Sequence, residues 1–427
     1  MDKILIQGPC RLSGKVRASG AKNAVLPEMA AFLMLEGPVT LRNVPSVRDV
    51  STMGLVLRHL GIRDLVLEGG VLSASGCEPK EPEAPYNLVR QMRASILVLG
   101  PLLARLGRAK VSLPGGCAIG ARPIDLHIDA LRKMGARIAI EHGYVLAECP
   151  RLRGAEIEFA KPTVTGTENI MMAAALAEGR TVLRNCALEP EIADLAAFLN
   201  GCGAKISGAG TGAITIDGVT RLRGSEHRAI PDRIEAGTFL IAAAATGGEV
   251  TVEGAEPEHL AALLEVMRAA GARVELHPGG SQPDERRTSM KVVPGGPLRA
   301  TSVTTLPHPA FPTDLQAQFM ALLTAASGVS TVTETVFENR FMHVGELRRM
   351  GAKIEVVGET ATVTGPTPLS GAPVMASDLR ASACLIVAGL LAEGDTLIDR
   401  AYHIDRGYEQ VVQKFRNLGA RIDRIRN

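Results

Sequence analysis

One helix-ending pattern occurs six times along the 427-residue chain, at intervals of 68 to 80 residues. In each copy a helix-like stretch ends in a glycine, and an extended segment begins directly after it. Because glycine lacks a Cβ atom, it can adopt the left-handed conformation that the position after a helix end requires. Each copy therefore predicts a helix, a glycine and a strand, and the interval predicts a duplicated structural unit. The copies are LRHLGI (57–62), LRKMGARI (131–138), LNGCGAKI (199–206), MRAAGARV (267–274), LRRMGAKI (347–354) and FRNLGARI (415–422).

A second feature of the repeat is an apolar helix-like stretch that ends in a glycine before a β-rich run. Examples are MAAFLML (29–35), NIMMAAALA (169–177) and ACLIVAGLLA (383–392). Helices that are apolar on nearly every side are buried within a domain. We therefore expect an α/β fold in which six units divide into two domains of three, with the helices inside and the sheets forming the outer wall. The alternative is a linear solenoid, but solenoid units are usually shorter, about 20–50 residues.

Composition excludes several classes of function. Lys and Arg number 47 against 45 acidic residues, so the chain has no general basic field for nucleic acid or anionic membranes. Aromatic residues make up 3% and Trp is absent, which leaves few platforms for stacking bases. The longest apolar runs are shorter than the roughly 18–20 residues of a membrane span, and we see no secretory leader. We expect a cytoplasmic protein with no nucleic-acid partner and no membrane insertion.

Seven cysteines are scattered along the chain and none forms a C-x-x-C pair, which argues against a disulfide framework or structural zinc. We expect most of them to be buried apolar residues, and we expect no metal or cofactor. Cys117 differs, because it lies in the glycine-rich segment LPGGCAIGARPIDLH (113–127). Glycine lets the backbone approach a ligand closely, and Arg122 offers a planar fork for phosphate or carboxylate. The alternative is a surface loop with an incidental cysteine.

The chemistry expected of Cys117 follows from its usual pKa near 8.5. Such a thiol is mostly protonated at neutral pH, so it suits a general acid better than a resting nucleophile. A cysteine hydrolase would also need a histidine base, and neither His127 nor His308 stands in a recognisable partner motif. We interpret both histidines as solvated or hydrogen-bonded loop residues.

Short arginine motifs recur near the repeat junctions, and in the two R-A-S copies the arginine lies at the start of an apolar helix, where a guanidinium group and the helix terminus both favour an anion. They are QMRAS (91–95), FENRFMH (337–343), SDLRAS (377–382) and HIDRGYE (403–409). Lys22 and Asn23 precede the first apolar helix in the same way. For any single arginine, a surface salt bridge is the alternative. Asp314, in HPAFPTD (308–314), is either a helix N-cap or a base for a sugar hydroxyl.

Two segments are interpreted as hairpins without a ligand. SGAGTGA (207–213) matches a dinucleotide fingerprint, but a strand-like Ile-Thr-Ile follows it where that fingerprint needs a helix. The polar segment SQPDERRTSM (281–290) is interpreted as a solvated hairpin loop.

Taken in order, the motifs resemble those of the UDP-N-acetylglucosamine 1-carboxyvinyltransferases, within the enolpyruvyl transferase or EPSP synthase family. The resemblance runs from end to end and rests on GAKNA (20–24), MRAS (92–95), LPGGCAIGARPIDLH (113–127), EPEI (189–192), PDRIE (231–235), PHPAFPTDLQAQF (307–319), TETVFENRFMH (333–343), DLRAS (378–382) and YHIDRGYE (402–409). It implies two inside-out α/β barrel-like domains, each of three repeated units. One domain would span residues 22–231 and the other residues 1–21 plus 232–427, with the active site in the cleft between them.

The resemblance implies transfer of the enolpyruvyl group from phosphoenolpyruvate to the 3-hydroxyl of UDP-N-acetylglucosamine, with release of phosphate, in peptidoglycan synthesis. It implies catalytic roles for Cys117, Asp314, Lys22 and Arg406, with Asp314 taking the sugar proton and Cys117 being the residue that fosfomycin alkylates. It implies substrate contacts for Lys22, Asn23, Arg93, Arg122, Pro123, Ile124, Asp125, Leu126, Lys161, Pro162, Thr163, Val164, Asp314, Val336, Arg340, Arg380 and Arg406. Two alternatives remain, a shikimate-3-phosphate enolpyruvyl transferase and a noncatalytic or regulatory nucleotide-sugar-binding paralogue.

Overall fold

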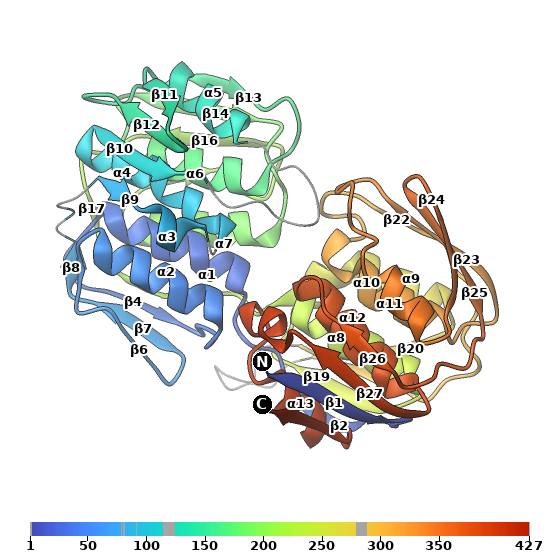
Figure 1. Cartoon of the computed structure of the whole chain (residues 1–427). Helices are drawn as coiled ribbons and strands as arrows, with labels where there is room; N and C mark the ends of the chain where they lie inside the picture. Colours follow the sequence, from blue (N-terminus) through green and yellow to red (C-terminus); the bar gives the residue numbers. More distant parts are fainter. Residues whose placement is uncertain are drawn as a thin grey trace. The chain divides into compact units, whose positions relative to one another are not determined.

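The structure is a computed structural model that describes residues 2–77, 79, 82–90, 92–113, 124–278 and 288–426 (Figure 1). The described residues form two compact units, each considered by itself below. The middle unit lies within residues 20–230, and the terminal unit combines residues 2–19 with residues 231–426. Each unit has its own hydrophobic core.

Three four-stranded sheets in each unit share one strand pattern, in which a parallel pair is followed by two antiparallel neighbours. In the middle unit they are β18 (Glu226–Arg228), β4 (Val39–Arg42), β7 (Val71–Ala74) and β6 (Val66–Glu68); β9 (Glu83–Ala84), β10 (Arg108–Ser112), β12 (Tyr144–Glu148) and β11 (Arg137–Glu141); and β13 (Glu156–Glu158), β14 (Arg180–Arg184), β16 (Ala213–Asp217) and β15 (Lys205–Ser207). In the terminal unit they are β2 (Ser13–Arg17), β19 (Glu249–Glu253), β21 (Ser289–Val293) and β20 (Arg273–His277); β22 (Val303–Thr305), β23 (Gly328–Glu334), β25 (Thr360–Gly365) and β24 (Lys353–Val357); and β26 (Pro373–Met375), β27 (Gly394–Asp399), β1 (Lys3–Gly8) and β28 (Ile422–Ile425). Two-stranded pairs join β3 (Leu35–Glu36) to β17 (Leu222–Arg223) and β5 (Ile62–Arg63) to β8 (Gly76–Cys77).

The helices alternate between buried and outer positions. All 13 residues of α8 are buried, as its alanine-rich sequence predicts. The buried helices are α1 (Lys22–Ala31), α4 (Leu99–Leu106) with the preceding 3-10 turn η2 (Arg93–Val98), α6 (Val164–Ala175), α8 (Arg233–Ala245), α10 (Thr313–Leu323) and α12 (Leu379–Leu391). The outer helices are α2 (Arg48–His59), α5 (Asp125–Lys133), α7 (Pro190–Gly201), α9 (Ala261–Ala269), α11 (Val344–Arg349) and α13 (Val411–Asn417). Shorter elements are α3 (Tyr86–Val89), η1 (Phe32–Met34), η3 (Pro257–Leu260) and η4 (Ala401–Arg406). The predicted arrangement of buried helices and outer sheets is confirmed.

The repeated glycines end the outer helices as predicted. All six, from Gly61 to Gly419, have positive φ angles between 88° and 102°. In four copies a side chain of the helix also donates a hydrogen bond to a carbonyl of the following strand, which holds the two elements together. These bonds run from Arg132 to Ile138, Asn200 to Ile206, Arg348 to Ile354 and Arg416 to Ile422. The second residue of the motif therefore has a structural purpose of its own.

Strand pairing closes each unit and excludes the linear solenoid. In the middle unit β18, at the end of the segment, pairs with β4 near its beginning. In the terminal unit β1 lies between β27 and β28, so the start of the chain completes the last sheet. A linear array would leave its first and last repeats unpaired with each other. The solenoid alternative is therefore wrong.

Smaller predictions from the sequence can be compared with the described part of the chain. SGAGTGA joins β15 to β16 in an antiparallel hairpin, as predicted. Five cysteines are free and buried: Cys10, Cys149, Cys186, Cys202 and Cys384. Most of the segment 281–290 lies outside the described residues, although β20 and β21 on either side of it pair antiparallel. Among the described residues, no helix has both the length and the apolar character needed to cross a membrane.

The glycine repeat gives a stability test. In Gly203→Ala the added Cβ meets no atom within 4 Å, so the cost arises from the φ angle of +100° alone. We expect the free energy of unfolding to fall by about 1–2 kcal/mol, measured by denaturant titration. Gly212→Ala, which has equal space and no positive φ, is the matched control and is expected to leave stability unchanged or to raise it by up to about 1 kcal/mol. Equal losses in both variants would contradict the conformational explanation.

Candidate active site

The structure distributes the predicted site residues between the two units. Lys22, Asn23, Arg93, residues 124–126 and residues 161–164 belong to the middle unit. Asp314, Val336, Arg340, Arg380 and Arg406 belong to the terminal unit. Cys117, Arg122 and Pro123 lie outside the described residues. The expectation that side chains from both units meet at one anion stays a prediction.

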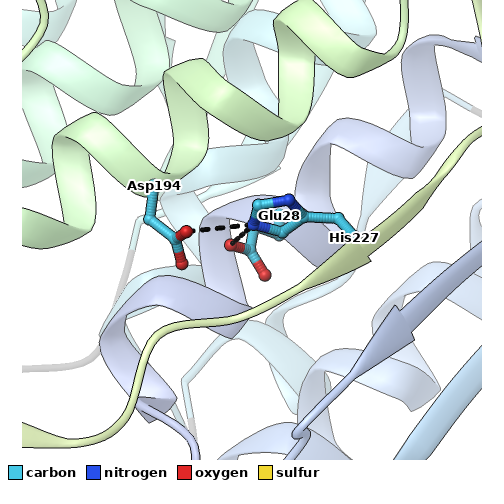
Figure 2. Close-up of side chains that lie close together, drawn as sticks. All are labelled: Glu28, Asp194 and His227. Atoms are coloured by element: carbon cyan, nitrogen blue, oxygen red, sulfur yellow. Dashed lines mark hydrogen bonds and ion pairs between the residues drawn. The ribbon is translucent and has the colours of Figure 1, made fainter. Parts of the chain in front are cut away.

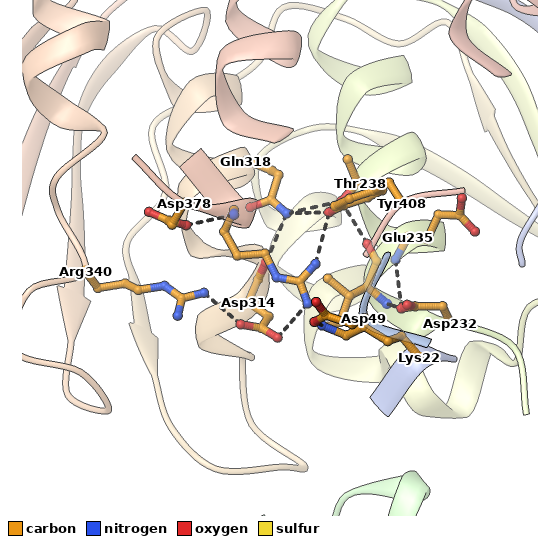
Figure 3. Close-up of polar contacts among 12 residues, drawn as sticks. Lys22, Asp49, Asp232, Glu235, Thr238, Asp314, Gln318, Arg340, Asp378 and Tyr408 are labelled. Carbon is orange, nitrogen blue, oxygen red and sulfur yellow. Dashed lines mark hydrogen bonds and ion pairs between the residues drawn. The ribbon is translucent and has the colours of Figure 1, made fainter. Parts of the chain in front are cut away.

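In the terminal unit, Asp314 lies between two guanidinium groups (Figure 3). Its Oδ1 accepts a hydrogen bond from Arg340 Nη2 and its Oδ2 accepts one from Arg380 Nη2, each at 2.7 Å. Both arginine side chains are buried, with exposed fractions of 4% and 8%. Burial alone would raise the pKa of Asp314, but the charges of Arg380 and Arg340 outweigh it and hold that pKa well below its usual range. Asp314 is therefore ionised at neutral pH.

The position of Asp314 differs from the N-cap alternative. Pro312 occupies the N-cap position of α10, and Asp314 lies within the first turn of that helix. Its carboxylate bonds to arginines of other elements instead of capping its own helix. The N-cap interpretation is wrong, and the residue is available for polar contacts outside its helix.

Arg380 is held at the start of α12 by contacts that the sequence did not reveal. Asp378 caps that helix and accepts the backbone N–H groups of Arg380 and Ala381. The buried hydroxyl of Tyr408 lies 3.4 Å from Arg380 Nη1. It also lies 2.8 Å from Thr238 Oγ1 and accepts a bond from Gln318 Nε2 at 3.1 Å (Figure 3). Helices α8, α10 and α12 thus meet at one polar cluster.

The loop that carries Val336 is tied to the start of α10. Buried Glu334 accepts the backbone N–H groups of Val336 and Phe337, and its other oxygen accepts the Thr313 hydroxyl at 2.8 Å. The Val336 side chain is exposed, and Arg340 lies over the Phe337 ring at 5.4 Å. Val336 therefore lies on the same loop as one of the two arginines that bind Asp314. Arg406 is the last residue of η4 and is half-buried.

In the middle unit, Lys22 is the first residue of α1 and forms an ion pair with Asp49 of α2. The Nζ to Oδ2 distance is 3.2 Å, and both side chains are largely buried, with exposed fractions of 12% and 4%. Asp49 lies in none of the sequence motifs, so the sequence alone did not identify it as a partner of Lys22. Asn23 follows Lys22 in the first turn and is half-buried.

His127 lies in α5 and links it to α6, so its description as a loop residue is wrong. It is buried in α5, where Nδ1 lies 2.9 Å from Asn169 Nδ2 and Nε2 lies 3.3 Å from Thr165 Oγ1. Asn169 Oδ1 accepts the N–H of Gly100, so the amide presents its NH₂ group to His127. The ring nitrogen facing it must accept, and the ring is neutral. Burial, followed by the charge of Arg93, lowers the pKa of His127 to about 4.

The other residues of the middle unit that are predicted to contact substrate lie around the starts of α5 and α6. Thr163 caps α6, and its hydroxyl accepts the N–H of Gly166 at 3.2 Å. Ile124 precedes α5 and is buried, whereas Asp125, Lys161 and Pro162 are exposed. Leu126 and Val164 are half-buried. The His127 to Thr165 contact brings these two helix starts together, so residues 124–126 and 161–164 are neighbours in space.

The described residues include one group with the spacing of a metal site, formed by Glu28, Asp194 and His227 (Figure 2). It belongs to the core of the middle unit and includes none of the predicted substrate contacts.

Comparisons with known proteins agree with this architecture. The sequence model of the family described as EPSP synthase (3-phosphoshikimate 1-carboxyvinyltransferase) matches residues 6–415. The chain is 58% identical, over the full length of both chains, to a UDP-N-acetylglucosamine 1-carboxyvinyltransferase of Anaeromyxobacter sp. (strain K). It is 54% identical, again over both full lengths, to the protein of that name from Desulfatibacillum aliphaticivorans.

Solved structures of similar fold extend the comparison. The enolpyruvyl transferase NikO from Streptomyces tendae has a TM-score of 0.87 and 25% identity, covering 99% of this chain and 98% of its own. An EPSP synthase from Acinetobacter baumannii has a TM-score of 0.77 over both full chains, at 17% identity, and so supports the fold alone. The predicted fold class of two inside-out α/β domains is confirmed.

The neutral, buried His127 gives a pH test. Its folded-state pKa of about 4 lies below the unfolded value near 6.5, so between these values the unfolded chain binds more protons. Stability is therefore lost as the pH falls from about 6.5 towards 4. We expect this one group to lower the free energy of unfolding by about 2 kcal/mol at pH 5 relative to pH 7.

Denaturant titrations at pH 5, 6 and 7 give the free energy of unfolding of the parent chain and of His127→Gln. The contribution of His127 is the difference between the two slopes of that free energy against pH. His277→Gln, which removes an exposed histidine, is the matched control and should keep the parent slope. If the slope of His127→Gln also equalled that of the parent, His127 would not be neutral in the folded chain.

Proposed function

The chain belongs to the EPSP synthase family of enolpyruvyl transferases, and we propose that it moves the enolpyruvyl group of phosphoenolpyruvate to the 3-hydroxyl of UDP-N-acetylglucosamine. The observation that carries the proposal is the 54–58% identity, over complete chains, to relatives whose names state that activity. The product would supply peptidoglycan synthesis.

The proposed reaction is an addition followed by an elimination. The sugar 3-oxygen attacks C2 of phosphoenolpyruvate and its proton passes to Asp314, while C3 accepts a proton from the Cys117 thiol. The tetrahedral centre that results carries a methyl, a carboxylate, a phosphate and the sugar oxygen. Loss of a methyl proton and of inorganic phosphate then restores the double bond. Fixed cations stabilise the charge that develops on the leaving phosphate, which is the role we assign to Lys22, Arg122 and Arg406.

The geometry at Asp314 adds a condition to this mechanism. A carboxylate whose pKa is held well below its usual range by Arg380 and Arg340 is a weak base. An arriving anion can accept hydrogen bonds from the same guanidinium groups, because each has five donors and uses one on Asp314. Competition for those donors would weaken their hold on Asp314 and raise its basicity. We infer that phosphoenolpyruvate itself prepares Asp314 to take the sugar proton.

Two other functions compete with this proposal. A shikimate-3-phosphate enolpyruvyl transferase would have the same fold, but the solved EPSP synthase is only 17% identical to this chain. A noncatalytic nucleotide-sugar-binding paralogue would keep the fold and could lose the reactive side chains. This sequence retains Lys22, Cys117, Asp314 and Arg406, which favours an active enzyme.

The acceptor specificity is tested by phosphate release from the purified full-length chain. We expect release only when phosphoenolpyruvate and UDP-N-acetylglucosamine are both present, and none when shikimate 3-phosphate replaces the sugar nucleotide. Phosphate release with shikimate 3-phosphate would show that the chain is a shikimate-3-phosphate enolpyruvyl transferase. No release with either acceptor would favour the noncatalytic paralogue.

The same assay tests the thiol. Cys117→Ser keeps the size of the side chain but raises the pKa of its acidic group, so we expect phosphate release to be suppressed and sensitivity to fosfomycin to be lost. Cys186→Ser changes a free cysteine of the core and is the control for removing a thiol elsewhere. Unchanged release and unchanged inhibition in Cys117→Ser would refute the role of the thiol.

The role of Asp314 is tested by Asp314→Asn, which preserves its shape and removes its charge. Loss of a general base lowers turnover by roughly 10²–10⁴-fold, and we expect kcat to fall within that range while UDP-N-acetylglucosamine still binds. Asp217→Asn, which removes an exposed carboxylate paired with Arg180, is expected to leave kcat unchanged. A normal kcat in Asp314→Asn would exclude proton transfer to this residue.

A further inference from the structure

Three residues distant in the sequence meet in the core of the middle unit, outside the proposed reaction (Figure 2). Glu28 comes from buried α1, Asp194 from α7 and His227 from β18. His227 Nε2 lies 3.0 Å from Asp194 Oδ1 and 3.4 Å from Glu28 Oε1. The side chains of Glu28 and Asp194 are 0% and 6% exposed. The cluster joins one buried helix, one outer helix and one strand.

Glu28 is less well satisfied than Asp194, because its contact in this cluster is with His227 Nε2, at 3.4 Å from its Oε1. His227 Nε2 carries at most one proton, and the closer Asp194 oxygen is its acceptor. Both carboxyl oxygens of Glu28 are buried and neither makes a hydrogen bond. Asp194 is better satisfied, because its Oδ2 accepts the N–H of Ile230 at 2.9 Å. A buried carboxyl group without a hydrogen bond is costly, so a metal ion bound directly to Glu28 would be favourable.

The spacing of the three donor atoms fits a small metal ion. Two ligands of a tetrahedral ion with bonds of about 2.0–2.1 Å lie about 3.3 Å apart. The observed distances of 3.0 and 3.4 Å from the imidazole nitrogen to the two carboxylates bracket that value. The three donor atoms lie within 4.8 Å of one another. One imidazole nitrogen and two carboxylate oxygens form a donor set that suits zinc and neighbouring divalent metals.

The surroundings of the cluster also favour a cation. Glu168 of α6 is buried in the same core and its Oε1 has no hydrogen-bond partner. Burial, followed by the charges of Glu191, Glu189 and Glu28, raises the pKa of Glu168 well above its usual value. Several carboxyl groups therefore lie close enough in this core to disfavour one another's ionised forms, and a bound cation would relieve that repulsion. The His227 side chain is 17% exposed, so an ion could enter from its side.

We propose that Glu28, Asp194 and His227 bind one divalent metal ion of the zinc type in the core of the middle unit. The ion would satisfy Glu28 and tie α1, α7 and β18 together, with the remaining coordination position open to water. This site is separate from the proposed substrate contacts and no step of the proposed reaction runs through it. If no metal bound here, the proposed function would be unaffected.

Cobalt binding to the full-length chain tests the site. Co²⁺ is a zinc substitute whose visible absorption reports tetrahedral coordination, and Cys117→Ser provides a background without the reactive thiol. We expect the chelator-treated protein to bind one equivalent of Co²⁺ that Zn²⁺ displaces, and to melt at a higher temperature with the metal. Absence of saturable binding of one equivalent would overturn the proposal.

Substitutions of the proposed metal-binding residues test whether Co²⁺ binds at this site. Glu28→Gln preserves volume and removes the charge, and we expect it and His227→Gln each to weaken Co²⁺ binding by at least about tenfold. His277→Gln removes an exposed histidine of the terminal unit and should bind Co²⁺ as the parent does. Parent-like affinity in both Glu28→Gln and His227→Gln would overturn the proposal.

A measurement on the unsubstituted chain covers the case in which these variants do not fold. Crystals soaked in Zn²⁺ and measured at the zinc absorption edge should give an anomalous peak about 2.0–2.2 Å from donor atoms of Glu28, Asp194 and His227. Peaks only at other side chains would exclude the site.

Discussion

The ion pairs between Asp314 and two buried arginines determine how the polar interior of the terminal unit is arranged. Asp314 accepts from Arg340 and Arg380 at equal distances, and Arg380 in turn contacts the Tyr408 hydroxyl. Removing one partner of such a group would leave a buried charge without compensation, which is strongly unfavourable. The starts of α10 and α12 and the loop of Arg340 are therefore coupled through one carboxylate. The same coupling would transmit the arrival of an anion to the residue that we propose as the base.

The inside-out fold provides the positions for this chemistry. The central helices are apolar along most of their length, and the first turns of three of them carry the charged residues Lys22, Asp314 and Arg380. Backbone N–H groups at these helix starts add a partial positive charge that favours anions. The three-fold repetition within a unit also brings the buried helices together, as the contacts of Thr238 in α8 and Gln318 in α10 with the Tyr408 hydroxyl demonstrate in the terminal unit. A fold of this kind can place cationic side chains at helix starts without giving the whole chain a basic charge.

Sequence patterns predicted the parts of the structure that depend on local rules. The glycine repeat was informative because only glycine adopts φ angles near 90–100° without strain, and the apolar helices were informative because their composition leaves no polar face. Asp49, Tyr408 and the cluster around His227 were missed, since each depends on partners that are distant in the sequence. His127 was misassigned for the same reason, because its partner Asn169 belongs to another helix. The resemblance to a family supplied Cys117 and Arg122 as site residues, and they stay predictions.

Carbon-13 NMR of the reaction mixture tests the central claim most directly. Phosphoenolpyruvate labelled at C2 would be incubated with UDP-N-acetylglucosamine and the full-length chain, and the fate of the label followed. Our account predicts a new vinyl ether carbon coupled to the sugar through its 3-oxygen, with an equal amount of inorganic phosphate. Label that remains in phosphoenolpyruvate, or that appears only as pyruvate, would contradict it.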